Sequence, residues 1–180
     1  MGGSVVVQTK ILLTVMGADR SGLTEALAAA VLAAGGNWQE SYLSRLGGKF
    51  VGSVLVALAP DGVDRLRAHL KSSAAADLRV EIVPAEAEAD VGEADGGETV
   101  QLTLTGQDRP GIVHEVSQVL ARLGANIVEL ETSTEPSAWS GSAMFRARTR
   151  LTLPDGLSHD ALQGGLEALS GDLMVDFEPL

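Results

Sequence analysis

Apolar residues recur at every second position at two places in this chain of 180 residues. The side chains at residues 11, 13 and 15 are apolar, and so are those at residues 100, 102 and 104. In the second stretch the residues between them, Gln101 and Thr103, are polar, so the alternation is clean there. A period of two is typical of a half-buried β-strand. The second stretch follows the first at an offset of 89 residues (100 − 11). The pattern therefore predicts two equivalent strands, each the first element of a repeated unit.

An amphipathic helix is predicted after each of these strands. Its apolar positions recur at i, i+4, i+7, i+8 and i+11, which places them on one helix face. Each pattern ends at a glycine, Gly35 or Gly124, as is common at helix C-termini. The apolar positions are Leu23, Leu27, Ala30, Val31 and Ala34 in the first copy and Ile112, Val116, Val119, Leu120 and Leu123 in the second.

Further along, the two copies keep their order of elements but differ in length. The segment LAPDG has its proline at Pro60 and LTLPDG has it at Pro154, an offset of 94. The second copy therefore carries five extra residues (94 − 89), which fall around STEPSAWSG. A second helix and a closing strand follow in each copy. Their apolar positions are Val63, Leu66, Leu70, Leu78, Val80 and Ile82, then Leu162, Leu166, Leu169, Leu173, Val175 and Phe177.

Each copy thus reads as strand, helix, strand, strand, helix, strand. This order predicts the α+β class, with two ferredoxin-like βαββαβ units in tandem. In each unit an antiparallel four-stranded sheet carries both helices on one face. We expect a first domain at residues 8–84, an acidic flexible linker at 85–98 and a second domain at 99–180. Units of about 75 residues leave a sheet face open, so we expect at least a homodimer.

Composition narrows the possible function classes. The formal charge of −11 opposes direct binding to nucleic acid. The row Arg146, Arg148 and Arg150 is expected to form cross-strand pairs with Glu129 and Glu131, and not to bind nucleic acid. The chain has no cysteine, which excludes disulfides and cysteine-based metal sites. No membrane-spanning or leader segment is recognised near the start, so a cytoplasmic protein is expected.

Two short motifs at the strand–helix turns carry the candidate chemistry. GADRSG occupies residues 17–22 and GQDRPG occupies residues 106–111. A helix beginning near Pro110 would offer unpaired N–H groups and a partial positive charge to a carboxylate. Asp108 could face an ammonium group, and Asn126, expected on an adjacent strand, can donate and accept. The candidate ligand-binding residues of the second copy are Gly106, Asp108, Arg109, Gly111 and Asn126.

The first copy is the weaker candidate for ligand binding. Ser21 stands where the second copy has Pro110, and Trp38 stands where it has Ile127. The bulk of Trp38 is expected to fill the pocket. The corresponding candidate residues are Gly17, Asp19, Arg20, Gly22 and Asn37.

The motifs and the repeated βαββαβ order resemble ACT domains. The segments AAGGN and RLGAN, which follow the first helix of each copy, belong to the same resemblance. More narrowly, the chain is similar to two-ACT proteins of the glycine cleavage system transcriptional repressor type. The resemblance implies a regulatory protein that binds a small amino acid, with glycine or serine favoured, and acts through a partner such as a transcription regulator. In amino-acid-binding members an asparagine often lies where this chain has Asp108, so that residue is a departure.

Alternative interpretations stay open for the motifs and for the chain. Asp19 and Asp108 could cap their helices for about 1 kcal/mol each, leaving a scaffold or dimerisation protein with empty sites. Trp139 in the insert could anchor a partner or fold back onto its own sheet. An enzyme is rejected because the three histidines form no metal-ligand pair and no nucleophile motif is present. No cofactor and no metal are expected.

Overall fold

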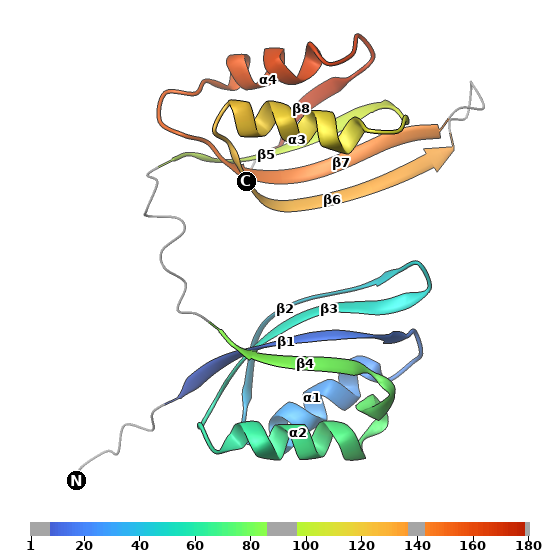
Figure 1. The fold of residues 1–180 in the computed structure, drawn as a ribbon, viewed down its shortest axis with the longest axis vertical. Coiled ribbons are helices and arrows are strands. Elements are labelled where there is room, and N and C mark those ends of the chain that lie inside the picture. Colours follow the sequence, from blue (N-terminus) through green and yellow to red (C-terminus); the bar gives the residue numbers. More distant parts are fainter. Residues whose placement is uncertain (1–7, 86–96, 137–142, 179–180) are drawn as a thin grey trace. The chain divides into compact units, whose positions relative to one another are not determined.

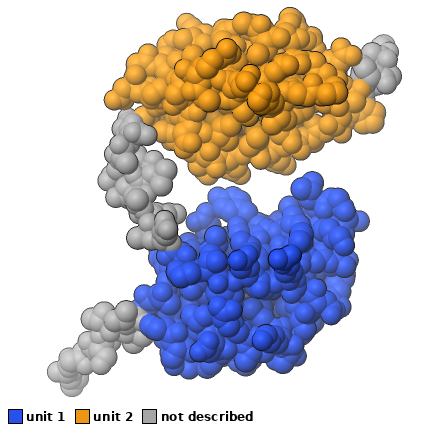
Figure 2. Space-filling model, in the orientation of Figure 1, with its two compact units in different colours: residues 1–88 blue, residues 89–180 orange. Residues whose placement is uncertain are grey.

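The structure is a computed structural model that describes residues 8–85, 97–136 and 143–178. The chain divides into two compact units, Met1–Glu88 and Ala89–Leu180, shown in blue and orange in Figure 2. Most of the segment predicted to be a linker, and Trp139, lie outside the described residues. The domain limits and the linker therefore stay predictions, and each unit is described by itself.

Both units have the predicted order of elements (Figure 1). The strands of unit 1 are ordered β2-β3-β1-β4 and those of unit 2 are ordered β6-β7-β5-β8, with antiparallel pairing throughout. Unit 1 contains β1 (Thr9–Ala18), α1 (Leu23–Ala33), β2 (Asn37–Leu46), β3 (Lys49–Leu58), α2 (Gly62–Ser72), the 3-10 turn η1 (Ala74–Asp77) and β4 (Arg79–Pro84). Unit 2 contains β5 (Thr99–Gln107), α3 (Ile112–Arg122), β6 (Asn126–Pro136), β7 (Ala143–Thr152), α4 (His159–Glu167) and β8 (Met174–Glu178).

Each unit has its own hydrophobic core between its helices and one face of its sheet. The central strands supply Leu13 and Leu102, which are fully buried at equivalent positions. The helix positions predicted from the apolar pattern are buried as well, except Val63, Leu123 and Leu169, which are half-buried. The predicted α+β fold, with ferredoxin-like units and helices on one face of each sheet, is confirmed.

Two local features depart from the sequence interpretation. Helix α4 ends at Glu167, so Leu169 packs against the core of unit 2 from beyond the helix. The turn η1 follows α2 in unit 1, where Ser73 accepts a hydrogen bond from the backbone N–H of Ala75 at 3.1 Å. Serine at the start of a turn satisfies an N–H group in this way.

The sheet faces away from the helices differ between the units. Strand pairing aligns Leu12 with Leu55 and Val83 on this face of unit 1. In unit 2 the same face carries the arginine row of β7, where Glu129 pairs with Arg150 at 3.3 Å, as predicted. Arg148 binds Glu178 of β8 instead, with 3.5 Å between Nε and Oε2. Glu178 also accepts hydrogen bonds from Gln101 and Thr103, and these bonds lower its pKa.

Candidate functional site

The GQDRPG loop of unit 2 joins β5 to α3. Gly106, still within β5, lies against Leu173, the residue before β8, because a Cβ placed on it would come within 3.1 Å of the Leu173 side chain. Gly111 is the N-cap of α3 and has a φ of 89°, a left-handed conformation that glycine adopts without strain. Helix α3 therefore begins after Gly111, and Pro110 precedes it instead of lying in its first turn. The N-caps of α1 and α3 are Gly22 and Gly111, and within the described ranges no helix N–H donates to Asp19 or Asp108, so neither aspartate acts as a cap.

Arg109 turns toward its own helix. Its Nη1 lies 2.8 Å from Oε1 of Glu115, and its Nη2 bonds the other carboxylate oxygen. A two-point pair of this kind is directional and stronger than a neutral hydrogen bond. The bond from Arg109 lowers the pKa of Glu115, and the bond to Glu115 raises the pKa of Arg109. Arg109 thus holds the loop on α3, and the carboxylate of a ligand would compete with Glu115 for it.

The loop is also fastened to the connection between α4 and β8. The backbone N–H of Gln107 donates to Oδ2 of Asp172 at 2.8 Å, and the Ser170 hydroxyl donates to Oδ1. Both hydrogen bonds stabilise the charged form, so they lower the pKa of Asp172, and the nearby Arg109 lowers it further. These partners were missed from the sequence, although Asp77–Leu78 and Asp172–Leu173 repeat as a pair before the last strand of each copy.

Asp108 and the start of α3 offer free polar groups. The Asp108 side chain is exposed and forms no ion pair within the described ranges, while its backbone N–H donates to the Ala143 carbonyl at 2.9 Å. The backbone N–H of Glu115 bonds the Gly111 carbonyl at 3.0 Å, but those of Val113 and His114 have no backbone acceptor among the described residues. An exposed carboxylate and unpaired helix N–H groups are therefore both present near the loop.

Asn126 lies at the other end of the same sheet. It is the first residue of β6 and pairs with Thr152, which in turn pairs with Thr99 at the start of β5. Gly106 lies seven residues further along β5 (106 − 99), about 24 Å away at ~3.4 Å per residue. The expectation that Asn126 lies beside the GQDRPG loop is wrong within one unit. The cause is α3, which runs back along the sheet before β6 begins.

The equivalent loop of unit 1 has no free carboxylate. Oδ2 of Asp19 lies 3.3 Å from Nε of Arg45 on β2. Arg20 reaches across to η1, where it bonds the Ala74 carbonyl and lies 3.0 Å from Asp77. Gly22 is the N-cap of α1 with a φ of 87°, matching Gly111. The motif arginine therefore braces the fold in both units, through different partners.

The first-copy asparagine is also remote from its loop. Asn37 pairs with Ala57, which is opposite Lys10 near the start of β1. Trp38 beside it packs against the core of unit 1, so the expectation that it fills a pocket at the loop is wrong. Gly17, at the loop end, would bring a Cβ within 2.5 Å of the Leu78 side chain. The loop ends of both units are thus closely packed against the residue that precedes the last strand.

Family comparison identifies the repeated unit. A profile of the ACT domain matches residues 100–151, and a second ACT-domain profile matches residues 9–83. The chain belongs to the ACT-domain family. It carries two ACT domains in tandem, which are regulatory modules that bind small amino-acid ligands.

Two solved structures are similar to this tandem ACT protein over nearly its whole length. An unknown protein from Galdieria sulphuraria has 31% sequence identity and a TM-score of 0.79, with 97% of this chain and 99% of that chain covered. A protein described as a candidate glycine cleavage system transcriptional repressor has 18% identity and a TM-score of 0.68, with the same coverage. At that identity the second likeness concerns the fold alone. No curated protein matches the chain.

Within the described ranges, no group of three or more histidine, aspartate or glutamate side chains is arranged to hold a metal ion. His69, His114 and His159 lie on three different helices. Across the same ranges no helix is both long and apolar enough to span a membrane.

Proposed function

We propose that this tandem ACT protein binds a small amino acid at the GQDRPG loop of unit 2 and passes that signal to a protein partner. The observation that carries the proposal is the exposed carboxylate of Asp108, which has no ion-pair partner among the described residues and lies near the N–H groups of Val113 and His114. The carboxylate of the ligand would accept hydrogen bonds from these N–H groups, where the helix dipole favours negative charge. Its ammonium group would face Asp108.

Glycine and serine are the proposed ligands because the loop is crowded. The crevice bounded by Gly106, Arg109, Leu169 and Asp172 leaves no room for even one water molecule. A ligand must therefore lie on the outside of the loop, where a small side chain is favoured. The likeness in fold to a candidate glycine cleavage system repressor supports the same choice.

A second copy of the chain would complete this site. Strand β6 is an edge strand of its sheet, with β7 on one side only. If the β6 strands of two copies paired antiparallel, Asn126 of one copy would lie beside Glu135 and Pro136 of the other. That end of β6 is the loop end of the sheet, because Thr134 pairs with Phe145, which pairs with Gly106. A homodimer would thus bring Asn126 and Asp108 to one ligand.

An empty scaffold is the alternative, and the same crowded loop favours it. Arg109 is already occupied by Glu115, and Asp172 by Gln107 and Ser170. A loop whose polar groups bond each other can hold two copies together without a ligand.

Calorimetry with glycine, serine and a panel of other amino acids distinguishes these functions. Hydrogen bonds to charged groups contribute ~1.5–3 kcal/mol, so Asp108→Ala should weaken binding at least tenfold. Asn126→Ala should weaken it as well. Asp19→Ala is the matched control and should leave binding unchanged, because Asp19 is paired with Arg45. Equal losses from Asp19→Ala and Asp108→Ala would contradict a site confined to unit 2, and no heat with any amino acid would favour the scaffold.

The oligomeric state tests the contribution of Asn126 separately. Sedimentation at micromolar concentration should give a dimer for the wild-type chain. A monomer that still binds glycine would remove Asn126 from the site while leaving Asp108 in it.

The proposed partner is a protein, such as a transcription regulator, and not DNA. The net charge of −11 and the pairing of Arg148 and Arg150 with glutamates support this choice. A mobility shift at physiological salt should show no specific complex. A complex that disappears when Arg146, Arg148 and Arg150 become alanine would instead make the control of transcription direct.

A further inference from the structure

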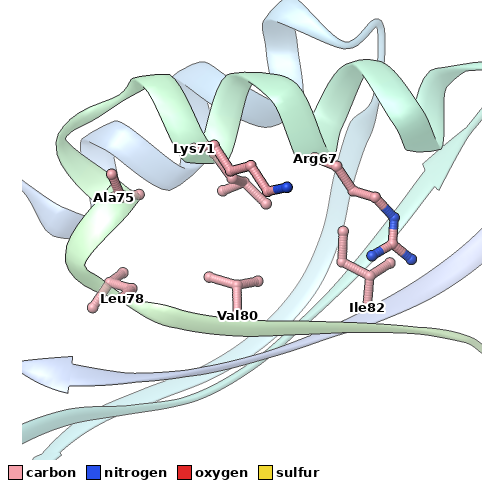
Figure 3. Close-up of a pocket in the computed structure, with 8 residues that line it drawn as sticks. Arg67, Lys71, Ala75, Leu78, Val80 and Ile82 are labelled. Atoms are coloured by element: carbon pink, nitrogen blue, oxygen red, sulfur yellow. The ribbon is translucent and has the colours of Figure 1, made fainter.

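A groove runs between α2 and the edge strand β4 of unit 1, about 220 Å³ in volume (Figure 3). Its floor is apolar, formed chiefly by Leu70, Leu78, Val80 and Ile82. The two leucines are buried, while the valine and isoleucine are half-buried and so remain partly open to solvent. Apolar surface left open in a concave site is a common feature of ligand pockets.

Two cations lie along one side of this groove. Arg67 and Lys71 are one turn apart on α2, and Figure 3 shows them above Ile82 and Val80. Within the described ranges neither forms an ion pair, whereas Arg65 on the same helix binds Asp61 at 2.7 Å. Like charges at i and i+4 destabilise a helix by a few tenths of a kcal/mol. An anion bound between them would remove this repulsion.

The equivalent groove of unit 2 is filled and lacks the arginine and the lysine of α2. His159 stacks on Phe177 with ring centroids 4.6 Å apart and planes at 9°, and Phe177 occupies the strand position of Ile82. Gln163 and Glu167 stand where α2 has Arg67 and Lys71, and Gln163 donates to Glu167 at 2.8 Å. The open cationic groove is therefore a property of unit 1 and not of the repeated fold.

We propose that this groove binds a small aliphatic carboxylate that has no amino group, such as a 2-oxo acid or a short-chain fatty acid. The tail would cover Val80 and Ile82, and the carboxylate would lie between Arg67 and Lys71. None of the residues lining the groove is acidic, so an ammonium group would meet two cations and no partner. A zwitterionic amino acid is thereby excluded. This ligand class and its place in unit 1 are both distinct from the amino-acid site proposed for unit 2.

The probe for this proposal is 4-methylpentanoate, titrated into the full-length chain and followed by the methyl NMR signals of Leu70, Val80 and Ile82. Saturable shifts in these signals are expected. Arg67→Gln and Lys71→Gln should each weaken binding at least tenfold. The matched control Arg65→Gln, on the same helix but outside the groove, should bind as the wild type does. No saturable shift at millimolar probe, or an equal loss with Arg65→Gln, would overturn the proposal.

Filling the groove gives a test that does not change any charge. Ile82→Phe places the unit 2 residue in unit 1 and should abolish binding. The spectrum of the variant shows whether unit 1 is still folded, and Ile82→Val, which keeps the groove open, should retain binding. Binding of the probe to folded Ile82→Phe with unchanged affinity would place the site elsewhere.

Three further ligands test which parts of the probe are recognised. Leucine, 4-methylpentanamide and inorganic phosphate should each bind at least tenfold more weakly than 4-methylpentanoate. Equal binding of leucine would overturn the exclusion of an ammonium group. Equal binding of the amide would show that the cations do not recognise the ligand, and equal binding of phosphate would show that the apolar floor does not.

Discussion

The last helix and last strand have the same topology in both units, but the space between them is open in one unit and filled in the other. In unit 1, α2 and β4 leave a groove beside two cations that form no ion pair with any described residue, whereas in unit 2 His159 and Phe177 fill the space between α4 and β8. At the loops the open feature is in unit 2: Asp19 of unit 1 is paired with Arg45, whereas Asp108 has no ion-pair partner among the described residues. Unit 1 thus leaves its cationic groove open and unit 2 leaves the Asp108 carboxylate exposed, while the counterpart of each in the other unit is filled or paired. The two units share the same kind of core, and they differ in the surfaces at which we propose that ligands bind.

The largest expected effect is a loss of stability on mutating the hydrophobic core, which both units build in the same way. Leu13→Ala and Leu102→Ala remove equivalent, fully buried side chains, and each should destabilise its own unit by about 3–5 kcal/mol. Because the two cores are separate, urea unfolding followed by NMR should show the loss in the mutated unit alone. Equal destabilisation of both units by either variant would contradict independent cores.

The next prediction concerns a position where the sheets differ. Gly52 in β3 has a φ of 153°, and a Cβ on it would lie 1.9 Å from the Tyr42 carbonyl oxygen. Gly52→Ala should therefore destabilise unit 1 by about 3 kcal/mol, since the backbone of β2 must move. The equivalent residue of unit 2 is Ala147, which is buried and has room for its methyl group. Ala147→Gly should cost only about 1 kcal/mol, and similar losses in the two sheets would show that β2 gives way easily.

A smaller effect is expected from opening the filled groove of unit 2. Phe177→Ile removes the stack with His159 and should destabilise unit 2 by about 1 kcal/mol. Thermal unfolding of unit 2 measures this loss. The same variant should not create a carboxylate site, because Gln163 and Glu167 supply no cation, and binding of 4-methylpentanoate there would contradict the role given to Arg67 and Lys71.

The smallest effect is a difference in acid sensitivity. Hydrogen bonds and nearby arginines lower the pKa values of Glu115, Asp172 and Glu178, and all three lie in unit 2. A carboxylate whose pKa is lower in the folded state stabilises that state above its ordinary pKa, here 4.5 for glutamate and 3.8 for aspartate. This stabilisation is lost as the pH falls below those values.

Stability measured by urea at pH 7 and at decreasing pH should therefore decline in unit 2 through this acid range. Glu115→Gln should flatten part of that decline, because it removes one of the three titrating groups. An unchanged pH profile in Glu115→Gln would show that its pair with Arg109 contributes nothing to folding.

Most of the fold could be predicted because it depends on local periods. The apolar residue at every second position of β1 and β5 and the five-position pattern at α1 and α3 are properties of short stretches. The cores bury the residues that these patterns mark, except Leu123, which is half-buried. The register of strand pairing was harder to predict. Both β2 and β6 shift register near their start, between Trp38 and Glu40 and between Ile127 and Glu129, and no residue pattern announces these irregularities.

The candidate site was predicted less well, because side-chain partners depend on segments far apart in the sequence. The pairing of Arg109 with Glu115 was missed although both residues were visible, since their meeting depends on the backbone turn at Gly111. The position of Asn126 could have been inferred. A helix of eleven residues spans about 16 Å and carries the chain to the far end of the sheet before β6 begins. The groove of unit 1 could not be inferred from the sequence, because it depends on no side chain filling the space between α2 and β4.

The separate cores also have a consequence for biosynthesis. A ribosome adds about 5–20 residues per second, so the residues of unit 2 need several seconds to emerge after those of unit 1. Small mixed α/β domains fold in less time than this. Unit 1 can therefore close around Leu13 before the matching strand with Leu102 has been made. Synthesis from the N-terminus thereby prevents the two similar units from exchanging strands while they fold. Refolding of the full chain from denaturant would allow such an exchange, because both units are then present from the start.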